Sequence, residues 1–207
     1  MIVGGGVRYS EAGETVEKFC EEFKIPFGES QAGKSACKSS HPYCLGGIGV
    51  TGTYASNIIA EDADVVIAIG SRMSDFTTSS KRLFKNPDVK FVTINNCRFH
   101  AYKMDAAKAV GDAKVTVEAL TKKLRARGYV SAYNGEIEEA KKVWDKEMVR
   151  LAGIEYTGDD FEPIIKARDP RTIPEFVKMT NGKITQTAAL AAIRRVIDED
   201  ATIITAG

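Results

Sequence analysis

Residues 64–70 read DVVIAIG, and this apolar run ended by glycine is the clearest structural signal in the sequence. The run is continuous rather than alternating and is rich in β-branched side chains, which is typical of a strand buried on both faces of a parallel sheet. Residues 89–95, VKFVTIN, repeat the pattern. Shorter strands are predicted at residues 2–3, 25–27 and 108–112.

Segments with helical patterns separate these strands. A helix following a possible N-cap at Ser10 would carry one apolar face, which consists of Val16, Phe19, Cys20 and Phe23. Further helices are predicted from about Thr53, over residues 79–85, and after Asp112 until Gly128. Strands alternating with helices predict a doubly wound, mostly parallel α/β sheet of the Rossmann-like type over residues 1–127.

The remainder of the chain differs in composition. Residues 136–151 form an amphipathic pattern, and residues 155–182 contain three prolines and many charges, so residues 128–182 are expected to be a helical or irregular linker. Residues 183–207 resemble the opening helix and strand of another α/β domain. Because both ends of the chain run into apolar strands, we expect a fragment of a longer protein.

Composition excludes several classes of partner. The formal net charge is +1, so no field over the whole chain would attract nucleic acid or an anionic membrane. No apolar run approaches the roughly 18 residues of a membrane span, and no secretory signal is visible. The four cysteines are too few for a secreted disulfide scaffold, which predicts reduced thiols and a cytoplasmic location.

Residues 28–35, GESQAGKS, match the phosphate-binding loop pattern G-x-x-x-x-G-K-[ST]. Such a loop needs a helix that starts at the Lys-Ser pair and directs its N-terminus at the phosphates. Here Lys34 and Ser35 are followed by Pro42 and several glycines, with no apolar stripe. A nucleotide hydrolase acting through Lys34 is therefore the less favoured interpretation.

The glycines at residues 4–6 follow a strand and precede a helix, as in dinucleotide-binding turns. A tight turn without any ligand explains them equally well. The acidic residue that would hold a ribose is replaced by Asn95 and Asn96, which could bind a hydroxyl only as neutral groups.

Cysteine and histidine spacing leaves a metal site as an alternative. Cys37, His41 and Cys44 lie within eight residues, and Cys97 and His100 form a Cys-x-x-His pair. The spacing is not that of a standard zinc site, so buried thiols and a surface histidine are favoured and no metal ligands are predicted. With only two histidines, no Ser-His-Asp or Cys-His catalytic arrangement is visible.

Six segments follow one another in the chain: IVGGGVRYS, IPFGESQAGKS, LGGIGVTGTYASN, ADVVIAIGSRMSDFTTSSK, INN and GDAKVTVEAL. Their order resembles that of the central domain of thiamine-diphosphate-dependent enzymes of the acetohydroxyacid synthase group. The resemblance is strong over residues 1–125 and weaker beyond. Within the family it is closest to the branch that opens a trihydroxycyclohexane-1,2-dione ring in myo-inositol degradation. The segments that carry this closer resemblance are ESQAGKS, GGIGVTGT, DFTTSSK and AYKMDA.

The resemblance implies an enzyme of three α/β domains that acts on a small-molecule substrate. In the family the first domain supplies a glutamate, and the third binds thiamine diphosphate and Mg²⁺ through a GDG motif, which these 207 residues lack. Residues 183–207 would be the truncated start of that diphosphate-binding domain. The fragment alone is expected to be inactive and to act with the remaining domains of its chain, in a homodimer or homotetramer.

Relatives in the family hold FAD or ADP in the central domain. The positions here that match this nucleotide cleft are Gly4, Gly5, Gly6, Gly49, Gly52, Gly70, Arg72 and Asn95. The usual D-I-D-like ending is I-N-N here, and the D-R pair is Asp75-Phe76, which favours a structural domain with a vestigial cleft. In this setting Gly33 would serve to turn the backbone, and Lys34 would face a cleft or a neighbouring domain. The alternatives are an acetohydroxyacid synthase-like fragment and an autonomous FAD- or ADP-binding module.

Overall fold

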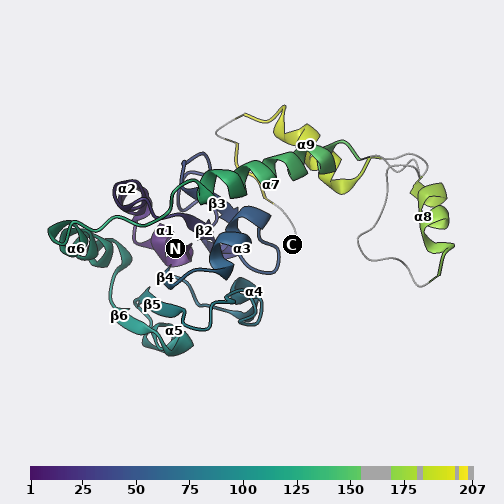
Figure 1. Cartoon of the computed structure of the whole chain (residues 1–207). Coiled ribbons are helices and arrows are strands. Elements are labelled where there is room, and N and C mark those ends of the chain that lie inside the picture. The colour runs from purple at the N-terminus through teal and green to yellow at the C-terminus, as the bar shows by residue number, and fades with distance from the viewer. Residues whose placement is uncertain (155–168, 181–183, 199–200, 205–207) are drawn as a thin grey trace. The chain divides into compact units, whose positions relative to one another are not determined.

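The computed structural model describes residues 1–154, 169–180, 184–198 and 201–204. Six parallel strands form one sheet in the order β3-β2-β1-β4-β5-β6 (Figure 1). The parallel α/β sheet predicted from the sequence is confirmed. The strands are β1 (Ile2–Val3), β2 (Phe27–Glu29), β3 (Cys44–Gly47), β4 (Val65–Ile69), β5 (Lys90–Asn95) and β6 (Ala107–Val110).

Helices and short 3-10 turns connect the strands. Side chains cap four of the described helices. The hydroxyls of Thr53, Ser74 and Thr185 and the carboxylate of Asp112 accept N–H bonds from the first turns of α3, α4, α9 and α6, respectively. The elements are α1 (Gly5–Tyr9), α2 (Gly13–Phe23), η1 (Gln31–Gly33), α3 (Tyr54–Glu61), α4 (Asp75–Thr78), α5 (Arg98–Ala101), η2 (Lys103–Asp105), α6 (Ala113–Ala126), α7 (Glu136–Ala152), α8 (Thr172–Thr180) and α9 (Gln186–Arg194).

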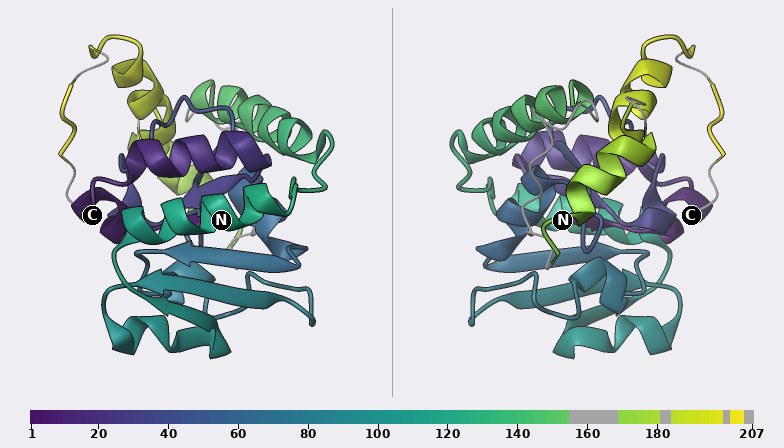
Figure 2. Two further views of the ribbon diagram at one scale, coloured as in Figure 1. Left: turned by 90° about the vertical axis from the view of Figure 1, so that its left-hand side faces the viewer. Right: turned by 90° about the vertical axis from the view of Figure 1, so that its right-hand side faces the viewer.

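The helices α2 and α6 lie side by side over one face of the sheet (Figure 2). Their apolar stripes meet the alternate strand residues that point to this face, such as Val3, Ile69 and Ile94. The four residues of the predicted α2 stripe are all buried, so the period of 3.6 residues identified the packing face correctly. Phe19 and Phe23 pack edge to face, with ring centroids 4.9 Å apart.

The other face of the sheet carries two smaller clusters. Ile2, Val66 and Ala68 pack with Ala60 of α3 and with Leu83. A third cluster joins four residues from β3, α3 and α7, which are Leu45, Ala55, Ile137 and Ala140.

The chain divides into two compact units, Met1–Trp144 and Asp145–Gly207. The first unit includes the start of α7, because that helix contributes to the third cluster. The division into functional domains at residues 127 and 182 stays a prediction. Within the described residues, no helix combines the length and apolar character needed to cross a bilayer.

In the second unit, α8 and α9 are helices. The predicted helix near residue 190 is confirmed as α9, which begins at the N-cap Thr185. Part of the proline-rich stretch is also helical, because Pro174 lies in the first turn of α8, where its missing N–H costs little. Residues 201–204 have no regular structure, and the rest of the strand predicted at the C-terminus, like residues 155–168, lies outside the described residues.

Several local predictions were wrong. The first helix begins at Gly5, inside the expected glycine turn, while Ser10 is the C-cap of α1 and α2 starts only at Gly13. The segment 79–85 is a series of turns, because Ser79, Ser80 and Lys81 all have positive φ. β3 was missed, since its two glycines and four-residue length hide it among loop residues.

The sheet reverses its strand order between β1 and β4. At the carboxyl ends of these two strands, the backbone of the turn after β1 packs directly on the backbone at the end of β4. The N–H of Gly6 donates to the carbonyl oxygen of Gly70 at 3.1 Å. A Cβ on Gly4 would lie 2.4 Å from that oxygen, and a Cβ on Gly6 would lie 2.6 Å from the Cα of Gly70. Gly70 itself has φ +59°. These glycines are therefore required for close approach of two chain segments.

We expect Gly70→Ala to lower the free energy of unfolding by about 3 kcal/mol or more, because it adds both a steric overlap and a strained φ. Urea unfolding followed by circular dichroism measures this loss. The matched control is Gly128→Ala, which has φ +60° but no atom within 4 Å of an added Cβ. That variant should lose only about 1 kcal/mol; equal losses for the two would contradict the packing role of Gly70.

Candidate functional site

The carboxyl ends of β1 and β4 are where an open α/β sheet of this strand order places its ligand. Of the predicted cleft residues, the structure brings Gly4, Gly6 and Gly70 together at this point. Gly5 lies beside them, and a Cβ there would lie 3.0 Å from the carbonyl oxygen of Ala32. The glycines thus face protein backbone rather than an open cradle.

Asn95 lies at the end of β5 and is buried. Its Nδ2 donates to the carbonyl oxygen of Ser71 at 3.0 Å, and its Oδ1 accepts from the N–H of Cys97 at 2.9 Å. Both ends of the amide thereby join the loop after β4 to the turn after β5. Arg72, the other polar member of the predicted cleft, is exposed.

The loop between β3 and α3, which contains Gly49 and Gly52 and is called the glycine loop here, packs on α4. A Cβ on Gly49 would lie 2.2 Å from the carbonyl oxygen of Phe76, and a Cβ on Gly52 would lie 2.8 Å from that of Gly47. The side chain of Asn57 holds the loop from α3, since its Oδ1 accepts from the N–H of Gly49 and its Nδ2 donates to the same residue's carbonyl oxygen. The loop is fixed by contacts within the protein.

Lys34 pairs with a buried carboxylate. Its Nζ lies 2.9 Å from Oε2 of Glu29, whose side chain is 0% exposed, and it also donates to Oγ of Ser39. The second oxygen of Glu29 accepts from the N–H of Ser35 at 3.2 Å. The Lys34 side chain is nevertheless 57% exposed, so the expectation that it faces a cleft or a neighbouring domain stays a prediction, and its ammonium supplies the counter-charge that the buried carboxylate needs.

The phosphate-loop interpretation also lacks its helix. Lys34 ends the short turn η1, and Ser35 has φ +63°, so no helix starts at this pair. A Cβ on Gly33 would lie 2.1 Å from the carbonyl oxygen of Val3, which explains this glycine by close packing on β1. GESQAGKS therefore consists of the end of β2 and a structural loop over residues 30–35.

The predicted burial of Cys37 and Cys44 is confirmed, and Cys20 is buried with them, whereas the prediction was wrong for Cys97, which is exposed. Burial raises the pKa of the Cys37 thiol to about 12, and also raises the pKa values of Cys20 and Cys44. Burial therefore disfavours the thiolate form, which is the form that binds zinc. Among the described residues, no three His, Cys, Asp or Glu side chains are grouped to hold a metal ion.

His41 is buried, contrary to the expectation of a surface histidine. Tyr43 donates its N–H to Nδ1 at 3.2 Å, and Nε2 lies 3.1 Å from a carboxylate oxygen of Glu21. With Nδ1 accepting, Nε2 carries the proton and donates. The loop after η1 is in this way attached to α2, and both ring nitrogens have partners.

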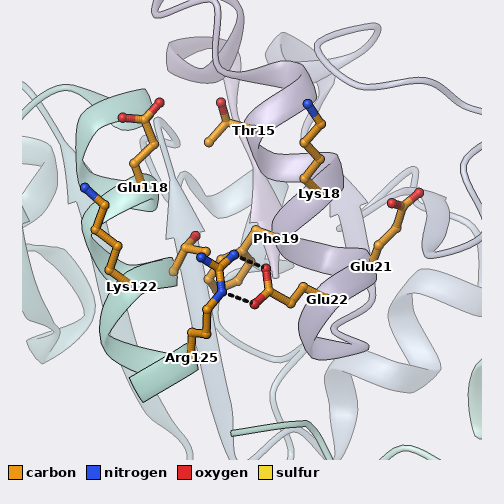
Figure 3. Close-up of a pocket in the computed structure, with 9 residues that line it drawn as sticks. Thr15, Lys18, Phe19, Glu21, Glu22, Glu118, Lys122 and Arg125 are labelled. Atoms are coloured by element: carbon orange, nitrogen blue, oxygen red, sulfur yellow. Dashed lines mark hydrogen bonds and ion pairs between the residues drawn. The ribbon is translucent and has the colours of Figure 1, made fainter. Parts of the chain in front are cut away.

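A groove of about 730 Å³ lies between α2 and α6 (Figure 3). Glu22 and Arg125 bridge it by two hydrogen bonds of 2.7 Å, and the guanidinium lowers the pKa of Glu22. Lys18 and Glu118 lie on opposite sides of its other end (Figure 3). The groove contains paired surface charges of opposite sign but none of the predicted cleft residues.

Sequence patterns did not single out Glu29 or Asn57. Glu29 could have been found, because a carboxylate inside the short strand preceding a Lys-containing loop calls for a neutralising partner. Asn57 gave no signal, since one asparagine in a helix is ordinary and its role depends on where the glycine loop lies.

The model of the thiamine pyrophosphate enzyme central domain matches residues 1–120. This matched segment contains every strand of the sheet. The chain belongs to the thiamine pyrophosphate enzyme family. The resemblance inferred from the order of motifs is thereby confirmed.

Similar members of this thiamine pyrophosphate enzyme family are named 3D-(3,5/4)-trihydroxycyclohexane-1,2-dione hydrolase. Those of Clostridium botulinum (strain Alaska E43 / Type E3) and Clostridium perfringens are both 58% identical over 99% of this chain and 32% of their own length. A Bacillus cereus protein with this name is 52% identical over the same shares. The chain thus spans about a third of the length of these relatives.

We expect Lys34→Ala to lower the free energy of unfolding by about 1–3 kcal/mol, because it leaves Glu29 buried without its cation. Thermal and urea unfolding measure this change. The double variant Glu29→Gln/Lys34→Met should recover much of the loss, and Lys38→Ala, which removes an exposed lysine nearby, should have little effect. A stable Lys34→Ala protein that has lost a measurable ATPase would contradict the structural role.

Proposed function

We propose that this chain forms the central domain of a thiamine-diphosphate-dependent hydrolase that opens the ring of a trihydroxycyclohexane-1,2-dione. The observation that carries the proposal is the 58% identity over 99% of the chain to relatives of that name. The proposed reaction adds water across a ring C–C bond next to a carbonyl group, and releases an open-chain acid. It would form part of myo-inositol degradation.

Thiamine diphosphate, when bound, supplies the nucleophilic carbon for such chemistry. The residues of this chain do not fit that cofactor, since no GDG motif occurs in the sequence. In the proposal this chain supplies a rigid central domain, and Mg²⁺ and the diphosphate are held by other domains of the same protein.

A nucleotide cleft in this domain stays a prediction. The contacts of its residues support a vestigial cleft that does not bind a nucleotide. Gly4, Gly6 and Gly70 approach one another as backbone, and the amide of Asn95 is engaged at both ends. FAD or ADP would need N–H groups and hydroxyl acceptors that are free. We also propose that the whole protein is cytoplasmic and assembles as a homodimer or homotetramer, as its resemblance to the family implies.

The test uses the polypeptide extended to the full length of its relatives, incubated with the cyclic dione, thiamine diphosphate and Mg²⁺. We expect loss of the dione with release of one acid equivalent, followed by pH-stat titration and by mass spectrometry. Omission of thiamine diphosphate should abolish turnover, and the 207-residue chain alone should be inactive.

Two results would contradict the proposal. Condensation of pyruvate to acetolactate by the extended protein, without turnover of the dione, would assign an acetohydroxyacid synthase activity instead. Ring opening by the 207-residue chain alone would show that its own residues carry the chemistry.

A further inference from the structure

Two aromatic side chains of the α5 region project into solvent, with Phe99 73% exposed and Tyr102 52% exposed. The helix that carries them is anchored, because Oγ1 of Thr93 on β5 donates to the carbonyl oxygen of Ala101 at 2.6 Å. Exposed aromatic residues beside arginine are enriched at the energetic centres of protein interfaces. A hollow of about 460 Å³ at this place is lined by Arg98, Phe99, Tyr102 and Lys103.

Cations lie over both rings. The Nζ of Lys103 is 5.5 Å from the ring centroid of Phe99, and the Nζ of Lys108 on β6 is 4.3 Å from that of Tyr102. Within the described part of the chain, no ion pair joins these lysines or Arg98 to a carboxylate. The surface therefore combines apolar rings with three positive charges that lack a counter-charge. We call these five residues the α5 patch.

The α5 patch adjoins a free sheet edge (Figure 1). Among the described residues, β6 pairs with β5 alone. The N–H of Gly111 donates towards β5, to the carbonyl oxygen of Asn95 at 3.2 Å. Because N–H groups alternate sides along a strand, those of Lys108 and Val110 point to the free edge. An extended chain could pair with them and reach the α5 patch with its side chains.

The charge of this edge selects its occupant. Lysine in the middle of a short edge strand opposes pairing with another copy of that strand, since two Lys108 side chains would meet. A segment rich in carboxylates meets attraction instead. We propose that β6 and the α5 patch form a docking surface for an extended acidic segment of a protein partner, which adds a strand along β6 and places carboxylates against Arg98, Lys103 and Lys108.

The test titrates the full chain into a fluorescently labelled peptide of four Glu-Val repeats, with a peptide of four Lys-Val repeats as the reversed-charge control. We expect the acidic peptide to bind with an affinity that falls as salt rises, and to protect the amides of Lys108 and Val110 from hydrogen exchange. The basic peptide should neither bind nor protect these amides.

Variants then separate this surface from general electrostatic attraction. Lys103→Glu/Lys108→Glu should lower the affinity for the acidic peptide by about tenfold or more. Lys122→Glu/Lys123→Glu on α6 makes the same change in charge and should leave this affinity unchanged. Val110→Pro removes one outward N–H at an edge, where proline is tolerated, and should also weaken binding. Circular dichroism confirms that each variant is folded.

Three outcomes would overturn the proposal. Equal affinity for the two peptides would show that the surface does not prefer carboxylates. Equal losses of affinity in the two double variants would show that the peptide does not bind specifically at β6 and α5. Tighter binding of single-stranded RNA than of the acidic peptide, lost in Lys103→Glu/Lys108→Glu, would assign the surface to nucleic acid.

Discussion

The close approach of Gly70 to the turn at Gly4 and Gly6 is the constraint on which the first unit depends. It joins the carboxyl ends of β1 and β4, the two central strands between which the sheet reverses its order. Side chains at these positions would separate the strands from their following loops. The same glycines that would serve a nucleotide by letting phosphate approach the backbone serve here to let one backbone segment approach another. A glycine-rich turn in a sequence therefore does not distinguish between a ligand site and a packing site.

A second constraint acts one strand away. Glu29 brings a carboxylate into the interior at the end of β2, and Lys34 neutralises it from the next loop. The lysine and glycine of the apparent phosphate-loop motif are both explained in this way, the glycine by its contact with the backbone of β1. The motif match thus arises from the needs of packing and charge compensation. Combined with the family match over residues 1–120, this supports a central domain whose main contribution is structural.

The sequence was sufficient to predict the parallel sheet, because continuous β-branched runs such as those of β4 and β5 fit no other environment well. It also predicted the buried face of α2, the helix that begins near Thr53 and the cap Asp112. It could not place β3, whose glycines carry little strand signal, or the left-handed residues Ser79 and Ser80, whose conformation depends on contacts with α4. The partners of Asn95 were also out of reach, since its hydrogen bonds to the loop after β4 and to the turn after β5 depend on tertiary structure.

The central claim is that the crevice between β1 and β4 is closed by backbone and holds no nucleotide. Isothermal titration of the folded chain with FAD and with ADP tests it most directly. The account predicts no saturable binding of either nucleotide up to millimolar concentrations. A micromolar dissociation constant for either one, lost on substitution of Arg72 or Asn95, would contradict it and would assign the glycines to a working nucleotide site.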